Sequence, residues 1–538
     1  MAGRSIRQIM HDITPYLALL VFVATLGSLQ FGYHLASGRQ PPPQSAATNS
    51  PTQAELNAPQ DVITCRKKSV STLARVAAGL REAVSRSASA SRSAAPGFLG
   101  ECIPMSEAAF ATVSSMFMVG GLAGAVAAGP LASKRGRLPA MKHTAALYVL
   151  GAAVEAMSSS VGVICLGRLL AGAAAGASTV IVPLYISEIS PPNERGLFGA
   201  MTQVSINIGI LLTQTLGYFL SYGKAWRWIF TVAGGIAAAQ FIGLLFVPES
   251  PAWLAAHGDP TGAARVLQRI RPKTANLRDE TSQWDQDGAT SSRSAEEEGL
   301  LSHTDEAASP PSTVARAPTR HMGFLEVARD VTTRPAIIAV VGIMVTQQFC
   351  GINSIIMYSV SLLADLLPVS SALLTIIISG INLGMTIACA PLPDRLGRKS
   401  CLLLSIIGQG SSSLALALSI IFGAKILSAI AVLFFVAFFA VGLGPVPFIM
   451  ASELVGQEAV GATQSWCLAA NYIATFIVAQ FFPIINTALN HALGKAGWVY
   501  FLFAGFATLG ATFVSARVPE TKGRRDVDEI WGRTRRLD

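Results

Sequence analysis

Twelve apolar runs, separated mostly by short polar loops, divide this chain of 538 residues. A helix needs about 20 mostly apolar residues to span a bilayer, and lipid offers the backbone no hydrogen-bond partner, so each run is expected to be helical. With 51% hydrophobic and 13% charged residues, the chain is not an ordinary soluble protein. The sequence therefore predicts an all-α, multi-pass integral membrane protein. The runs cover residues 15–36, 106–130, 139–158, 161–188, 197–220, 227–248, 335–360, 368–393, 400–422, 426–451, 463–487 and 496–517.

Two basic, glycine-containing loops mark an internal repeat. Residues 130–137 and 393–399 each follow the second run of their half and lead into the third. This pattern predicts two related six-helix bundles, with inverted repeats inside each half and a substrate site between the bundles near the middle of the membrane. The expected divisions are an N-terminal bundle (1–249, with a long outer loop at 37–105), a cytoplasmic linker (250–333), a C-terminal bundle (334–517) and a cytoplasmic tail (518–538).

The distribution of basic residues predicts the orientation. Lys134, Arg135, Arg395 and Lys522 all fall on one side if the twelve helices alternate, and that side is then cytoplasmic, with both termini. The formal net charge of +9 reflects this bias, so we expect the lipid bilayer and not nucleic acid as the macromolecular environment. We expect a functional monomer in the plasma membrane or the vacuolar membrane.

The polar segments support fewer predictions. Residues 259–270 have the apolar spacing of a short amphipathic helix, whereas residues 273–320 have little to bury and are expected to be disordered. Cys65 and Cys102 share the outer loop, where a disulfide is chemically permitted, but the sequence does not determine their distance. No spacing suggests a metal site, and no nucleophile–base constellation or phosphate loop appears. We therefore predict no metal, no cofactor and no enzymatic activity.

Neutral amide side chains interrupt several apolar runs. An amide both donates and accepts hydrogen bonds, which suits an uncharged ligand with many hydroxyl groups. The alternative is that each amide only holds helices together, at around 0.6 kcal/mol apiece. The close spacing of three of them in one run favours a common site over isolated packing contacts. The amides are Gln203, Gln347, Gln348, Asn353, Asn382 and Asn471.

Short motifs in both halves carry a resemblance to a known family. The first half has Gly27-Ser-Leu-Gln-Phe-Gly-Tyr33, Gly167-Arg168, Pro183-Leu-Tyr-Ile-Ser-Glu188 with Arg195-Gly196, and Pro248-Glu-Ser-Pro251. The second half has Gln347-Gln-Phe-Cys-Gly-Ile-Asn353, Gly444-Pro-Val-Pro447 and Pro519-Glu-Thr-Lys-Gly523. In this order and spacing, the chain resembles the sugar porters of the major facilitator superfamily, in particular facilitative glucose transporters and their fungal relatives.

The resemblance implies roles for further residues. The six amides would line a monosaccharide site, with rings at Phe448 and Tyr472 where the family often has tryptophan. Apolar walls would come from Phe31, Ile206, Ile210 and Ile352. Charged residues at the cytoplasmic helix ends would form ion pairs between the halves that close the inner side and break on opening. This gate set comprises Glu188, Arg195, Glu249, Asp394, Arg395, Arg398 and Glu453. Ser133 stands where the family usually has aspartate, which implies a weaker latch in the N-terminal half.

The predicted function is transport of a monosaccharide, most simply a hexose such as glucose, by alternating access and without ion coupling. A histidine, His34, follows the Gly-Tyr pair of the first run, and because histidine is a common proton-carrying side chain, a proton-coupled symporter is one alternative. A carrier of a polyol such as inositol, or of a pentose, is another. A non-transporting sugar receptor is a third, from a different class, and the short tail after Gly523 speaks against it.

Helix 1 is expected to end early. The stretch before Ala36 and the stretch after Gln53 together resemble the family's continuous helix 1, but residues 36–53 intervene and contain three consecutive prolines. A proline triplet cannot continue a helix, so the helix should end near Leu35. Residues 36–53, and 71–95 as well, are either insertions or natural lineage-specific loops.

Overall fold

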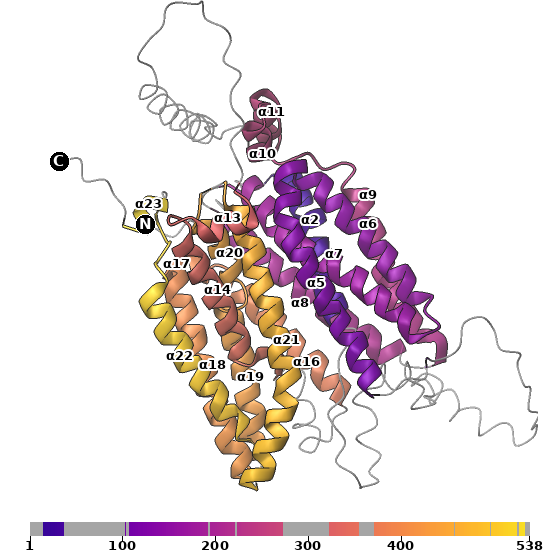
Figure 1. Cartoon of the computed structure of the whole chain (residues 1–538), viewed down its shortest axis with the longest axis vertical. Helices are drawn as coiled ribbons and strands as arrows, with labels where there is room; N and C mark the ends of the chain where they lie inside the picture. Colours follow the sequence, from indigo (N-terminus) through magenta and orange to yellow (C-terminus); the bar gives the residue numbers. More distant parts are fainter. Residues whose placement is uncertain are drawn as a thin grey trace, which may run out of the picture.

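Two helical bundles lie side by side in the computed structural model (Figure 1). The structure describes residues 14–36, 103, 107–191, 194–220, 223–272, 322–354, 371–456, 458–494, 497–524 and 527–532. The N-terminal bundle contains α2 (Pro15–Ala36), α5 (Glu107–Arg135), α6 (Arg137–Ala156), α7 (Val161–Ile189), α8 (Arg195–Leu220), η1 (Gly223–Trp226) and α9 (Arg227–Gly243). The C-terminal bundle contains α14 (Arg334–Phe349), α16 (Ser371–Cys389), α18 (Arg398–Ile421), α19 (Lys425–Val441), α20 (Val446–Glu453), α21 (Val460–Leu493) and α22 (Val499–Arg517).

Each of the twelve predicted runs contains a helix, but two runs are interrupted: α14 of the seventh run ends at Phe349, and the tenth run is divided into α19 and α20. Eight helices in the described part of the chain are long and apolar enough to cross a membrane. The helices α6, α9, α16 and α21 are not among those eight; α9, for example, has only 17 residues. Helix α2 is described up to Ala36, and residues 36–53 and 71–95 lie almost wholly outside the described residues, as do Cys65 and Cys102.

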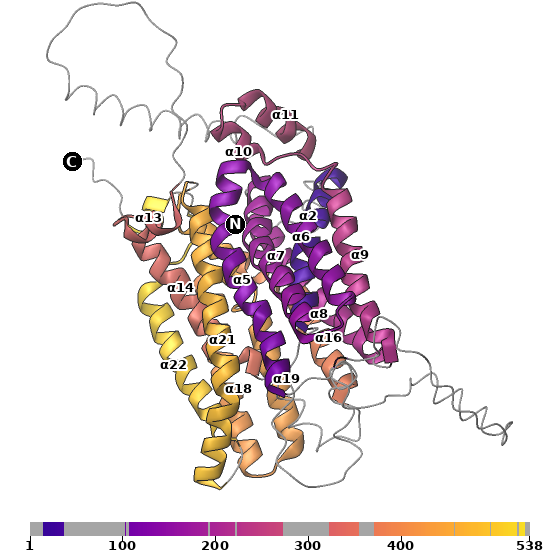
Figure 2. The ribbon, with the colours of Figure 1, turned by 45° about the vertical axis from the view of Figure 1, so that its right-hand side comes forward.

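Short helices gather at one end of both bundles in Figures 1 and 2. They are α10 (Pro251–Ala256), α11 (Pro260–Ile270), α13 (Phe324–Arg329), α17 (Leu392–Leu396) and α23 (Val527–Ile530). Helix α11 confirms the amphipathic helix predicted at residues 259–270. The Asp259 carboxylate accepts a hydrogen bond from the Gly262 amide at 2.8 Å and so caps its first turn.

Glycines permit the closest helix packing in the N-terminal bundle. A methyl group on Gly172 would lie 2.2 Å from the Phe117 carbonyl oxygen, and one on Gly176 would lie 1.9 Å from that of Gly121. Helices α5 and α7 therefore touch backbone to backbone, as small residues allow inside membranes. This arrangement holds the inner face of α5 against the other bundle, where the amide of Gly129 donates to the Ser465 hydroxyl at 3.1 Å.

Candidate functional site

Two breaks in the transmembrane helices of the C-terminal half build the first part of the site. The seventh run was predicted as one continuous helix, but α14 ends at Phe349 and the chain turns at Gly351, whose φ is +95°. A side chain on Gly351 would collide with the Phe503 ring, 2.6 Å from a Cβ placed there, so both the conformation and the space require glycine. The tenth run is broken at Gly442–Pro445, between α19 and α20.

These breaks bring four of the predicted amides into one hydrogen-bonded chain. The Oε1 atom of Gln347 accepts from Gln348 Nε2 at 3.0 Å and from Asn471 Nδ2 at 2.7 Å. Asn353 Nδ2 donates to Gln348 Oε1 at 2.6 Å. Gln347 Nε2 donates to the carbonyl oxygen of Leu443. This carbonyl can accept from a side chain because it lies in the break between α19 and α20. Gln347 is therefore the centre of this chain.

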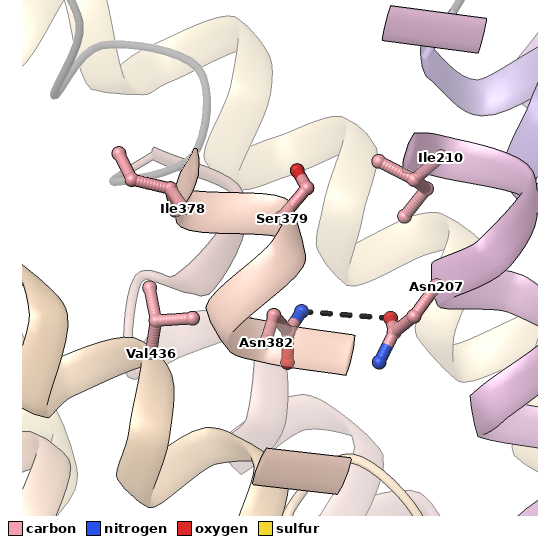
Figure 3. A pocket seen from close by; sticks show the side chains of 6 residues that line it. All are labelled: Asn207, Ile210, Ile378, Ser379, Asn382 and Val436. Carbon is pink, nitrogen blue, oxygen red and sulfur yellow. Dashed lines mark hydrogen bonds between the residues drawn. The ribbon is translucent and has the colours of Figure 1, made fainter. Parts of the chain in front are cut away.

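A second amide chain crosses between the two halves. Gln203 Nε2 donates to Asn207 Oδ1 at 3.2 Å on the same helix, α8. Asn207 Nδ2 donates to the Thr386 hydroxyl of α16 at 2.8 Å, and Asn382 Nδ2 lies 3.5 Å from Asn207 Oδ1 (Figure 3). The sequence reasoning missed Asn207. Its position four residues after Gln203, on the same helix face, was the available signal.

The two hydrogen-bonded amide chains lie next to each other. A Cβ on Gly444, in the broken segment, would lie 3.6 Å from Gln203 Cγ. A pocket opens beside the second chain and is bounded by both halves (Figure 3). Its lining consists of Asn207, Ile210, Ile378, Ser379, Asn382 and Val436. Ile210, which was expected to form an apolar wall, lines this pocket. Gln203 and Asn382 lie in the crossing chain and do not bond directly to the Gln347 group in the described structure.

The predicted aromatic and apolar residues other than Ile210 form either a ring contact across the two halves or buried packing inside the bundles. Phe31 of α2 meets Tyr472 of α21 edge to face across the two halves, with ring centroids 6.3 Å apart. Gly121 makes room for that ring, because a Cβ there would lie 2.4 Å from Tyr472. Phe448 and Ile352 are buried in the core. Ile206 is also buried, with its backbone carbonyl 2.0 Å from a Cβ placed on Gly32, so it packs α8 against α2.

A buried ionic cluster lies in the N-terminal bundle. His34 Nδ1 is 3.5 Å from Glu155 Oε2, and Arg168 Nε is 3.6 Å from Glu155 Oε1. Arg168 Nη1 also donates to the His34 carbonyl at 3.0 Å. His34 and Glu155 side chains are 0% exposed. Glu155 was missed, although a single acid inside the apolar run 139–158 was the available signal.

The end of the N-terminal half that is predicted to be cytoplasmic contains a tight ion pair. Arg137 donates to Glu188 through Nε and Nη2, with a closest distance of 2.6 Å, and both side chains are almost fully buried. Glu249 accepts from the amides of Arg137 and Leu138 at the start of α6. Burial raises the pKa of the Glu249 carboxyl above its usual range, and its backbone hydrogen bonds, including one from Ser250, oppose this.

The C-terminal half repeats this arrangement. Arg398 donates to Glu453 at 2.9 Å and lies 2.9 Å from Asp394, while Glu520 accepts from the Arg398 and Lys399 amides at the start of α18. Burial raises the pKa of the Asp394 carboxyl, and the Arg398 guanidinium opposes that effect. The two glutamates after the apolar runs therefore cap equivalent helices in the two halves, which is the structural meaning of the sequence repeat.

The described gate pairs differ from the expected ones. The ion pairs between described side chains at this end, Arg137–Glu188 and Arg398 with Glu453 and Asp394, each join residues of one half. The reason is that each arginine begins a helix and points back at the end of a helix in its own bundle. Arg395 is exposed, and the side chain of Arg195 lies outside the described residues. Arg137 and Glu520 were missing from the predicted gate.

Ser133 lies at the boundary between the halves. Its hydroxyl oxygen is 3.1 Å from a Cβ placed on Gly461, in the first turn of α21, and its carbonyl accepts from the Trp253 indole at 2.9 Å. A serine here carries no charge to interact with the positive end of the α21 dipole.

Comparisons with known proteins agree with this architecture. A family model described as "Sugar (and other) transporter" matches residues 20–531. A probable metabolite transport protein of Saccharomyces cerevisiae is 33% identical over 521 residues, 96% of each chain. The glucose transporter GlcP of Staphylococcus epidermidis is 31% identical over 80% of this chain and 90% of its own. The structure of the E. coli proton:xylose symporter XylE bound to 6-bromo-6-deoxy-D-glucose has a TM-score of 0.71 at 23% identity, covering 96% of this chain and 98% of its own, and shares the fold.

Proposed function

The chain belongs to the family of sugar (and other) transporters, and we propose that its cargo is a monosaccharide, a hexose such as glucose, carried by uniport. The family consists of membrane transporters and not enzymes. The rocking units would be residues 1–249 and 334–517, joined by the linker 250–333 and followed by the tail 518–538. A monomer in the plasma membrane or the vacuolar membrane would suffice, because each chain contains both halves. The relative that is named a glucose transporter supports the choice of a hexose as the cargo.

The amide chains carry this proposal. Six amides plus Asn207 gather where the two halves meet, and their described partners are one another, a threonine hydroxyl, a thioether and a backbone carbonyl. Such a set offers donors and acceptors without a charge, which matches the hydroxyl groups of a sugar. Sugar hydroxyls would replace the amide-to-amide bonds on binding. The helix ends held by Arg137 and Arg398 would then move as rigid parts of each half.

Uptake of labelled D-glucose into liposomes containing the purified protein tests the proposal. We expect saturable uptake that unlabelled glucose inhibits and L-glucose does not, because a site of oriented amides distinguishes hydroxyl configurations. Xylose and myo-inositol, added as competitors, separate a hexose carrier from a pentose or polyol carrier. Absence of saturable uptake of labelled D-glucose, and of labelled xylose and labelled myo-inositol measured in the same way, would refute the sugar transport proposed for this chain.

A proton-coupled symporter is the second candidate function, and the ionic cluster favours it. Ionisable groups inside membrane bundles are costly and commonly belong to ion or proton pathways. Arg168 and Glu155 neutralise each other, so a proton on His34 would add a net charge to a site that also packs against the Tyr148 ring, 5.6 Å from the imidazole. The alternative role of the cluster is structural, because it joins α2, α6 and α7.

Sugar-induced proton movement distinguishes a uniporter from a proton-coupled symporter. For a uniporter, glucose added to lightly buffered cells that express the chain leaves the external pH unchanged, and uptake does not respond to a proton ionophore. The His34→Asn variant should then transport at close to the wild-type rate. Alkalinisation on adding glucose, absent in His34→Asn and Glu155→Gln but present in the wild type, would establish the symporter instead. L-Glucose serves as the control addition.

A further inference from the structure

We propose that Asn207 and Thr386 form the hydrogen bond that lets the two halves close when no sugar is bound. This inference rests on the proposed function and adds a role for two residues that neither the sequence motifs nor the comparisons single out. The bond joins α8 of the N-terminal half to α16 of the C-terminal half, with Asn207 Nδ2 2.8 Å from Thr386 Oγ1. Asn207, one member of this bond, lines the pocket that both halves bound (Figure 3).

Both side chains of this bond are buried, so its loss leaves a polar group without a partner. Asn207 and Thr386 are each 1% exposed, so neither can exchange its partner for bulk water in this conformation. A buried polar group without a partner is strongly disfavoured, and the amide of Asn207 would lose its acceptor if the hydroxyl were absent. The Thr386 hydroxyl donates in turn to the Asn382 carbonyl at 2.8 Å, so its lone pairs remain available to Asn207.

The transport cycle explains why such a bond is needed. A uniporter that performs net transport must return without cargo, and during that return the sugar-binding amides meet each other across the closing halves. With sugar bound, hydroxyl groups satisfy the amides. Without sugar, Gln203 bonds to Asn207, and Asn207 bonds to Thr386. The same chain leaves Asn382 Oδ1 buried without a hydrogen-bond partner among the described residues, which gives an arriving hydroxyl a place to bond.

Two modes of transport separate this role from simple sugar binding. Net uptake into empty liposomes includes the empty return, whereas exchange of labelled for unlabelled D-glucose at equal concentrations does not. We expect Asn207→Val and Thr386→Val each to slow net uptake by about two- to tenfold, the factor that corresponds to one net hydrogen bond. Exchange should fall less, so the ratio of exchange to net uptake should rise. The double variant should add little beyond either single variant, because both remove the same bond.

Thr144→Val is the matched control. Thr144 is a buried threonine of α6 whose hydroxyl, among the described residues, bonds within its own helix to the Met141 carbonyl at 2.8 Å, so its loss should leave the ratio unchanged. If Asn207→Val and Thr386→Val lower exchange and net uptake by the same factor, the two residues only bind sugar or only stabilise the fold, and the proposal is wrong. A wild-type protein that moves no sugar would contradict the proposed function itself.

A second measurement does not depend on transport. Spin labels at Lys134 and Leu396, exposed positions at the inner ends of the two halves and on the side of the site where Thr386 lies, report their separation in the sugar-free protein. The Asn207→Val and Thr386→Val variants should shift the distance distribution toward longer distances relative to the wild type and to Thr144→Val. Unchanged distributions would overturn the closing role, even if uptake is impaired.

Discussion

Replacing Gln347 with alanine is expected to lower the uptake of labelled glucose by about 10- to 100-fold. Gln347 donates to the Leu443 carbonyl and accepts from Gln348 and Asn471, so its loss leaves several buried groups without partners. Each such group costs about 1–3 kcal/mol when unpaired, and 1.4 kcal/mol corresponds to a factor of ten. The change should act mainly on kcat/KM, because the amide would bond to the sugar during transport.

The control for Gln347→Ala is Gln240→Ala. Gln240 is an equally buried amide, but it lies on α9 in the other half, close to Gly27 of α2 and away from both amide chains. It should retain near-normal uptake per folded molecule. Asn353→Ala should share the defect of Gln347→Ala, since Asn353 belongs to the same chain. Normal uptake in both Gln347→Ala and Asn353→Ala would place the sugar site elsewhere.

Breaking the buried Arg137–Glu188 pair should have the largest effect on stability. Arg137→Met leaves the carboxylate of Glu188 buried and without its partner, with only 2% of that side chain exposed. Removing one member of a buried ion pair costs about 3–5 kcal/mol in the free energy of unfolding. We expect a clear fall in the thermal unfolding midpoint of the purified protein in detergent.

Two further variants test whether the unpaired carboxylate of Glu188 causes this loss of stability. Arg137→Met with Glu188→Leu removes both charges, and an apolar pair of similar volume can be as stable as the ions it replaces, so most of the loss should be recovered. Arg398→Met should cost less than Arg137→Met, because its partners Glu453 and Asp394 are 22% and 32% exposed and water can solvate them. A double variant no more stable than Arg137→Met would show that the charge left behind is not the cause.

Some features of the site could not be predicted from local sequence. The spacing of Gln347, Gln348 and Asn353 was interpreted on a continuous helix, yet Asn353 reaches Gln348 because the helix is interrupted at Gly351. A lone glycine in an apolar run does not indicate such a break, because the break depends on the Phe503 ring that packs against Gly351. Asn207 was not singled out from the sequence, because its role depends on a hydroxyl that α16 places opposite it.

The sequence by itself determined the architecture and the family. The apolar runs required helices, because a backbone in lipid must satisfy its own hydrogen bonds, and the repeated basic loops divided those helices into two equivalent bundles. It also predicts that neutral amides, and not charged side chains, line the cargo site. Only the tertiary structure decided which groups are partners: Arg137 with Glu188 inside one half, Glu155 with His34 and Arg168, and Asn207 with Thr386 across the halves. Pairing depends on distances between residues far apart in the chain, and helix packing alone sets those distances.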